Sequence, residues 1–445
     1  MGGSTGRRGT REVRIMRIAG GGPAVGAMMR ALAAAVGTGV LLLTGCGSGP
    51  APGASGTGSA TQPAASVPPS ATPVSGCASG SATDQPGTPD QARPDLGVMG
   101  VLAAMDTTAE RIVASGRQSV DAAGAAAPGS TWTFDVRTRT WVDQGAAATG
   151  QAASVGLLEF VYDEAANRTV GLPTGLAPVW TYDLAGNVWT QVDAEGGGSD
   201  WWPIVAYDPD RQQVLAWEHH GLHGAMVKAL DLQTGTWAVL YAQDRASGAA
   251  PPGADALIMG GVAVAYDTVV RRLILILTMA GDLEQTGETW AFDPAEGTWE
   301  QGAPVPNTLP GGYPAGWVAA FDPQQGRTVL FADTAVLAYD AAGDTWTTVE
   351  RGPGWPTGCT VAGVAVDPTA RVGHQMVYDP ISGRMVVLGG SVRPVGEPPG
   401  GLTYDEEAPA IDDVWAYDLA SNTWTQLLAP SATSPGAQPT SRLGP

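Results

Sequence analysis

The chain has 445 residues and a formal net charge of −20, from 43 acidic against 23 basic side chains. Hydrophobic residues make up 44% of it, enough to build a sizeable core. A chain this acidic repels nucleic acid and anionic lipid head groups, so we expect no nucleic-acid partner and no direct binding to a membrane surface.

The first 45 residues have the composition of an export signal. Six arginines precede an apolar run at 31–43, which is too short to stay in a bilayer as a permanent helix. The segment Leu43 to Cys46 resembles the bacterial lipoprotein cleavage box, whose cysteine is diacylated and becomes the new N-terminus. We therefore expect a lipoprotein signal peptide at 1–45, lipidation of Cys46, and a protein anchored to the cell membrane through this lipid on its extracytoplasmic side. An ordinary secretory signal is the alternative.

Residues 46–95 are almost entirely Gly, Ala, Ser, Thr and Pro, so they bury too little apolar surface to fold. We expect a disordered, flexible tether, which as a random coil would span on the order of 40 Å. Residues 431–445 are predicted to form a disordered tail. Without the signal, 17 basic residues face 42 acidic ones, a net charge of −25.

Residues 96–430 contain a repeated pair of residues. Six times a Phe, Tyr or Leu is followed by Asp, and a Trp comes six positions after that Asp, while the distance between successive units varies from 47 to 78 residues. So fixed a spacing indicates a rigid turn between two paired strands, and the variation belongs to loops. The pairs are Asp135 and Trp141, Asp183 and Trp189, Asp231 and Trp237, Asp293 and Trp299, Asp340 and Trp346, and Asp418 and Trp424.

A second signature precedes each of these pairs. It is an apolar strand that ends in an aromatic residue or Met followed by Asp, then a polar turn and a β-branched run such as 273–277. The six aspartates are Asp106, Asp163, Asp208, Asp267, Asp322 and Asp379. Six four-stranded units of about 50 residues predict an all-β fold, a six-bladed β-propeller, in which the tryptophans pack between blades.

The last unit is the most complete. Its motifs are Arg371, Gly373-His374, Tyr378 to Pro380, Gly389-Gly390, and Trp415 to Asp418 with Trp424. This unit resembles a kelch repeat of the galactose oxidase-type propeller superfamily, and the resemblance extends over residues 97–430. The earlier units lack the glycine doublet and look like degenerate copies. The resemblance implies a kelch-like propeller at 96–430.

Two activities that such a fold can carry are not expected. A galactose oxidase-type copper site would need two His and two Tyr ligands with a cross-linking Cys, and His374 is the one histidine outside the 219–223 cluster. A sialidase would show Asp boxes with the Trp five residues after the Asp, whereas the gap here is six. No catalytic residue, metal or cofactor is predicted, and we consider an enzymatic activity less favoured than binding.

The histidine cluster and the acidic loop each leave two interpretations open. His219, His220 and His223 beside Trp217 form either a solvated loop or a metal site, and we favour the loop. The stretch from Tyr404 through Glu406 to Asp413 is rich in carboxylates, which would suit Ca²⁺, although a solvated acidic loop is favoured.

Single aromatic and basic residues are further candidates. Trp202 and Trp355 lie in loops between blades, where they either stack on a sugar or pack against the rim. Arg371 and His374 stand at the start of a first strand, where the kelch resemblance implies a structural role; a ligand-binding role is the alternative. Cys77 and Cys359 are predicted to approach each other where the first and last blades meet, with a disulfide or two free thiols as the alternatives.

Loop lengths indicate which face of the propeller binds. The turns between strands one and two and between strands three and four are short and constant, whereas the other connections vary, and in a meander these two kinds emerge on opposite faces. We expect a binding or scaffold protein that recognises a protein or carbohydrate ligand on the variable face. A carbohydrate-active or other hydrolytic enzyme is the alternative. The ligand-binding residues predicted are Trp202, Trp217, His220, His223, Trp355, Arg371, His374, Tyr404 and Glu406.

Overall fold

A computed structural model of the chain gives the fold, and the described residues belong to one compact unit, Ser70–Pro445. Every regular element among them is a β-strand, and none of them forms a helix long and apolar enough to cross a membrane. The structure describes residues 91–94, 101–116, 131–145, 157–173, 178–196, 203–219, 224–243, 262–278, 287–306, 317–332, 335–352, 355–356, 360–361, 364–365, 368, 371–392 and 411–430.

The described strands form six four-stranded sheets, each an antiparallel meander in sequence order. The first sheet comprises β1 (Val101–Asp106), β2 (Arg111–Gly116), β3 (Trp132–Asp135) and β4 (Thr140–Asp143). The second comprises β5 (Leu157–Asp163), β6 (Arg168–Pro173), β7 (Val179–Asp183) and β8 (Val188–Val192). The third comprises β9 (Ile204–Asp208), β10 (Gln213–His219), β11 (Ala225–Asp231) and β12 (Thr236–Ala242).

The other three sheets repeat this order. The fourth comprises β13 (Val262–Asp267), β14 (Arg272–Thr278), β15 (Gly287–Asp293) and β16 (Thr298–Gln301). The fifth comprises β17 (Val318–Asp322), β18 (Arg327–Ala332), β19 (Ala335–Asp340) and β20 (Thr345–Val349). The sixth comprises β24 (Gln375–Asp379), β25 (Arg384–Leu388), β27 (Val414–Asp418) and β28 (Thr423–Leu428), and two short pairs lie beside it, β21 (Thr360–Val361) with β22 (Val364–Ala365) and β23 (Arg371–Val372) with β26 (Ser391–Val392).

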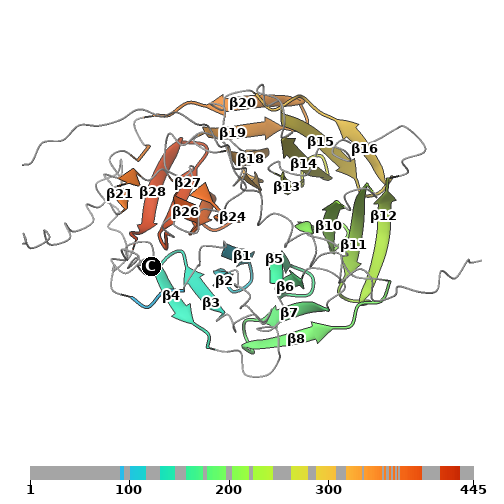
Figure 1. Ribbon diagram of the computed structural model, residues 1–445, viewed down its shortest axis with the longest axis horizontal. Helices are drawn as coiled ribbons and strands as arrows, with labels where there is room; N and C mark the ends of the chain where they lie inside the picture. The colour runs from blue at the N-terminus through green and yellow to red at the C-terminus, as the bar shows by residue number, and fades with distance from the viewer. Residues whose placement is uncertain are drawn as a thin grey trace, which may run out of the picture. The chain divides into compact units, whose positions relative to one another are not determined.

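The six sheets are arranged as a closed ring of blades. The first strand of each sheet contacts the first strand of the next, and β24 of the sixth sheet contacts β1 of the first. Seen down the ring, these first strands lie innermost and the fourth strands form the outer rim (Figure 1). The predicted all-β, six-bladed β-propeller is confirmed.

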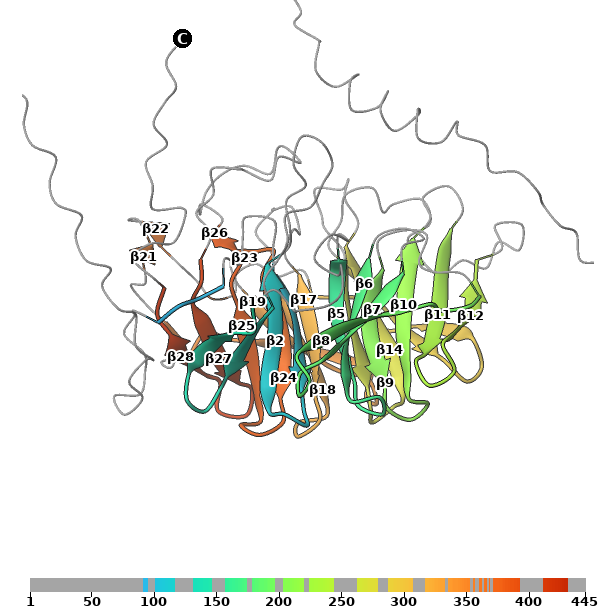
Figure 2. The same ribbon diagram turned by 90° about the horizontal axis from the view of Figure 1, so that it is seen from below.

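Each tight turn is closed by the aspartate that ends the preceding strand. In the β9–β10 turn, Asp208 Oδ1 accepts hydrogen bonds from the backbone N–H groups of Asp210 (3.0 Å) and Arg211 (3.1 Å). The residue four positions after the Asp then has a positive φ, as at Gln212 (58°). At Gly297 (65°) only glycine fits, because a Cβ would lie 2.7 Å from the Leu240 carbonyl oxygen. The turns between the first and second strands of the sheets lie together on one side of the ring (Figure 2).

Ion pairs tie the two turns of a sheet together on this side. The arginine that begins a second strand reaches the aspartate that ends the third strand, and the sequence analysis did not foresee this pairing. The N···O distances are 3.0 Å for Arg111–Asp135, 3.2 Å for Arg168–Asp183 and 3.0 Å for Arg327–Asp340. The pairs are partly exposed, so each contributes at most about 1 kcal/mol to stability.

The repeated tryptophans pack between blades, as predicted. Four of the six lie in a buried cluster with residues of their own sheet and of the preceding sheet, and Trp299 and Trp346 are partly buried and pack against such a cluster, so that every junction of the ring has one. In five of the six sheets the Trp packs on the aromatic residue that precedes the Asp, with ring centroids 5.0 Å apart for Tyr182–Trp189 and 4.8 Å for Tyr417–Trp424, and in the third sheet that residue is Leu230. The spacing of six therefore places one ring over the other across the turn.

Replacing Trp189 by Ala should destabilise the ring strongly. This side chain is 5% exposed, packs on Tyr182 and Phe160, and donates a hydrogen bond from Nε1 to Thr131 Oγ1 of the first sheet (2.9 Å). We expect the free energy of unfolding to fall by about 3–5 kcal/mol in chemical denaturation. The matched control is Val142→Ala on β4, where the side chain is 49% exposed and a change within about 0.5 kcal/mol is expected. Equal losses in the two variants would contradict the packing role of the repeated Trp.

Candidate functional site

Two buried clusters of charged side chains lie at the strand ends opposite the tight turns. One joins the end of β10 to the middle of β11 in the third sheet, and the other surrounds the start of β24, the end of β25 and the start of β27 in the sixth. The connections between second and third strands leave the sheets at these ends; the one between β10 and β11 is short, and the one between β25 and β27 is long. The clusters thus stand at the base of the segments for which sequence analysis predicts ligand binding.

Arg371 is the centre of the cluster in the sixth sheet. It is 2% exposed, and its guanidinium holds Asp413 with two nitrogens, Nη1 to Oδ1 at 2.5 Å and Nη2 to Oδ2 at 2.9 Å. Nη1 also donates to the Gly389 carbonyl oxygen (3.1 Å), and Trp415 Nε1 donates to Asp413 Oδ2 (2.7 Å). Bidentate pairing of this kind satisfies both charges inside the protein.

The backbone around Arg371 is shaped by glycine. β23 and β26 pair beyond the β24–β25 hairpin, with Arg371 opposite Val392. The hairpin bends between the two pairs, where Gly389 and Gly390 have φ values of 59° and 90°. These conformations are costly for residues with a Cβ, so the doublet permits the bend that carries the Gly389 carbonyl to the guanidinium. The glycine doublet follows directly after the end of β25 at Leu388.

His374 lies beside this cluster and is buried, with 3% of its surface exposed. Nδ1 and Nε2 of its ring have no hydrogen-bond partner among the described residues. Burial, together with the positive charge of Arg371, lowers the pKa of His374 from 6.5 to about 3. The imidazole is therefore neutral at physiological pH and does not act there as a cation for a ligand.

The cluster in the third sheet is an ion pair between Lys228 of β11 and Glu218 of β10. Nζ lies 3.0 Å from Oε2, and both side chains are buried. Lys228 is the single lysine of the chain. The sequence shows this but does not show which carboxylate the lysine pairs with. The pair lies next to His219 and Ala225, between which the β10–β11 connection carries His220 and His223.

Four of the nine predicted ligand-binding residues are described, and all four are buried. Trp217 is 3% exposed and belongs to the core between the third and fourth sheets. Trp355 belongs to the core between the fifth and sixth sheets, and its Nε1 donates to Asn422 Oδ1 in the β27–β28 turn (2.7 Å). Neither ring offers a free face for stacking, and Trp355 packs against the rim. Arg371 makes the contacts expected of a structural residue, and the His374 ring is buried. A ligand-binding role for any of the four stays a prediction.

Two carboxylates of the acidic loop are not free for a cation. Asp413 pairs with Arg371, and Asp412 Oδ1 lies 3.4 Å from Arg93 Nη1. Within the part of the chain that the structure describes, no group of three or more His, Cys, Asp or Glu side chains is placed to hold a metal ion. The other predicted positions lie outside the described residues: Trp202, His220, His223, Tyr404, Glu406, Cys46, Cys77 and Cys359.

Comparison with known proteins adds little beyond the fold. No protein-family model and no curated protein matches the chain. A structure described as a putative gluconolactonase is 14% identical over 67% of this chain and 87% of that chain, with a TM-score of 0.41. A chain of the nidogen/laminin complex is 13% identical over 56% and 80%, with a TM-score of 0.37. An auxiliary nutrient binding protein from Bacteroides thetaiotaomicron is 10% identical over 52% and 56%, with a TM-score of 0.35. Similarities this weak carry no information on ligand or activity.

The buried His374 should make the protein sensitive to acid. The unfolded imidazole takes up a proton below about pH 6.5, whereas the folded one does so only near pH 3, so protons favour the unfolded state and stability falls between these values. In His374→Leu this contribution is absent, while the other three histidines and the carboxylates are unchanged. We expect wild type to lose about 3 kcal/mol more than the variant between pH 7 and pH 4, as measured by chemical denaturation at each pH. Parallel pH profiles would show that His374 is accessible to protons.

Proposed function

We propose that this protein is a lipid-anchored, extracytoplasmic binding or scaffold protein built on a kelch-like propeller. It recognises a protein or carbohydrate ligand through the side of the ring from which the long connections leave. The signal-like residues 1–45 and the Cys46 box support the anchor, and the glycine- and proline-rich residues 46–95 support a tether that keeps the ring clear of the membrane. The motifs of the sixth sheet support the kelch-like assignment.

The position of the two buried ion pairs carries this proposal. Glu218–Lys228 fixes the two strands that flank the β10–β11 connection, and Arg371–Asp413 fixes those that flank the β25–β27 connection. The β10–β11 connection is short and the β25–β27 connection is long, but both start and end on strands held by a buried ion pair. Connections anchored on a rigid base are where recognition usually resides, because the ends are held while the segment between them can vary. On the other side the turns are short and each is closed on its own Asp, so little there distinguishes one blade from another.

Substitutions in the connections on this side of the ring should therefore weaken ligand binding, and substitutions in the tight turns should leave it unchanged. The probes are soluble peptidoglycan fragments and neutral cell-wall polysaccharides, each tested by thermal shift. A bound probe at about 100 times its Kd adds roughly 2.7 kcal/mol to the free energy of unfolding. We expect His220→Ala or Tyr404→Ala to abolish the shift, and the turn variants Ser382→Ala and Ser421→Ala to retain it. The reverse pattern would place recognition on the tight-turn side.

Lipidation is tested separately by the location of the protein in the cell. Cys46→Ala removes the thiol that would be acylated, so the variant should move from the membrane fraction to the soluble or secreted fraction. Cys77→Ala is the matched control and should stay with the membrane. Equal distribution of wild type and Cys46→Ala between the fractions would rule out the lipid anchor.

A further inference from the structure

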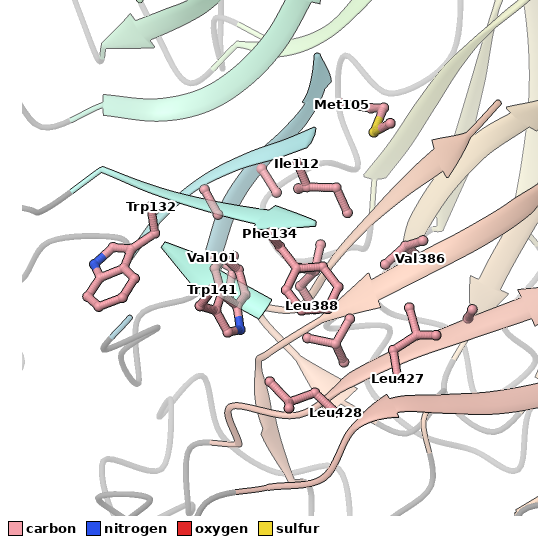
Figure 3. Close-up of a cluster of buried hydrophobic side chains, with 14 residues drawn as sticks. Val101, Met105, Ile112, Trp132, Phe134, Trp141, Val386, Leu388, Leu427 and Leu428 are labelled. Carbon is pink, nitrogen blue, oxygen red and sulfur yellow. The ribbon is translucent and has the colours of Figure 1, made fainter. Parts of the chain in front are cut away.

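The junction between the sixth and first sheets is the one at which the chain does not run directly from one sheet into the next. Its apolar part joins side chains such as Trp141 and Phe134 of the first sheet to Leu388, Leu427 and Leu428 of the sixth (Figure 3). One backbone hydrogen bond, from Val101 N to the Gly373 carbonyl oxygen (2.9 Å), joins the sheets near the start of β1. A third element holds this junction, the short segment 91–94.

Gln91 binds the outer edge of the first sheet. Its Nε2 donates to the Arg139 carbonyl oxygen (2.9 Å), and its Oε1 accepts the backbone N–H of Trp141 (2.7 Å). Arg139 and Trp141 stand four and six positions after Asp135. The primary amide of Gln91 thus offers β4 the same donor and acceptor as a peptide group in a neighbouring strand.

The same two positions are satisfied by main chain at another junction. Between the second and third sheets, Glu195 N donates to the Gly235 carbonyl oxygen (2.8 Å), and Trp237 N donates to the Glu195 carbonyl oxygen (2.7 Å). Gly235 and Trp237 stand four and six positions after Asp231. The side chain of Gln91 therefore takes the place that the chain leaving the preceding sheet occupies there.

Arg93 binds the sixth sheet from the same segment. Its Nη1 donates to the Ala429 carbonyl oxygen just after β28 (2.5 Å) and lies 3.4 Å from both the carbonyl oxygen and Oδ1 of Asp412. Its side chain is almost fully buried, Pro94 is buried and Ala92 is exposed. Residues 91 and 93 thus contact different sheets, and the segment bridges the junction.

We propose that the junction between β4 and β28 is a peptide-binding site for an extended Gln-x-Arg segment, which the chain fills with its own residues 91–94 and so closes the ring. Recognition rests on the Gln amide pairing with the free edge of β4 and on the Arg guanidinium pairing with Asp412 and the Ala429 carbonyl. The ring therefore begins at Gln91, within the segment expected to be a tether. This bridge stands apart from the predicted Cys77–Cys359 disulfide.

Hydrogen exchange on the full chain tests the proposal. The Trp141 N–H donates a hydrogen bond to Gln91 Oε1. In Gln91→Ala/Arg93→Ala this bond is lost, so the exchange of the Trp141 N–H should become about tenfold faster or more. The Trp237 N–H, which meets the Glu195 backbone, is the internal control and should keep its rate. A synthetic peptide spanning residues 84–95, added to the double variant, should slow exchange at Trp141 again, and the same peptide with Ala at positions 91 and 93 should not.

The outcomes separate clearly. An unchanged Trp141 rate in the double variant, or equal effects of the two peptides, would overturn the proposal. Should both amides exchange faster because the double variant unfolds, the single variant Gln91→Ala, which leaves Arg93 in place, gives the same comparison. In that variant the ratio of the Trp141 rate to the Trp237 rate must still rise, and a constant ratio would overturn the proposal as well.

Discussion

The structure depends on each sheet covering both faces of its neighbours, because no sheet has a core of its own. β14 shows this directly: Leu273, Leu275 and Leu277 pack toward the third sheet, whereas Ile274 and Ile276 pack toward the fifth. Its apolar run is continuous because both faces are covered. A gap anywhere in the ring would expose an entire sheet face. The sixth–first junction lacks a direct chain connection, and the bridge from Gln91 to Arg93 links the two sheets there.

The features that sequence analysis predicted are those set by local interactions. The spacing of six between Asp and Trp follows from a turn that closes on the Asp side chain and brings the Trp ring across from the aromatic residue before it, as at Tyr417 and Trp424. All the groups involved lie within eight consecutive residues, so one repeat suffices to reveal them.

The features that sequence analysis did not predict depend on strand register and on contacts between residues far apart in the sequence. Trp217 was expected at a binding face, although Leu215 two residues earlier is buried and a strand places both on the same face. Arg371 was recognised, but Asp413, 42 residues away, was assigned to a solvated loop because sequence cannot show that the chain returns to the guanidinium. Gln91 and Arg93 lie at the end of a low-complexity stretch and follow no repeat, so only the folded ring reveals their partners.

The buried ion pairs are better explained by specificity than by stability. Transferring two charges from water into a core offsets most of their attraction, so apolar residues at Glu218 and Lys228 would hold the sheet about as well. An apolar pair, however, tolerates sliding, whereas a carboxylate and an ammonium 3.0 Å apart permit one relative position of β10 and β11. Arg371 and Asp413 impose the same restriction across β23, β25 and β27, with the Gly389 carbonyl as a third point. Both restrictions act where the connections between second and third strands leave the ring, which is where a one-residue slip would reverse the side chains presented to a ligand.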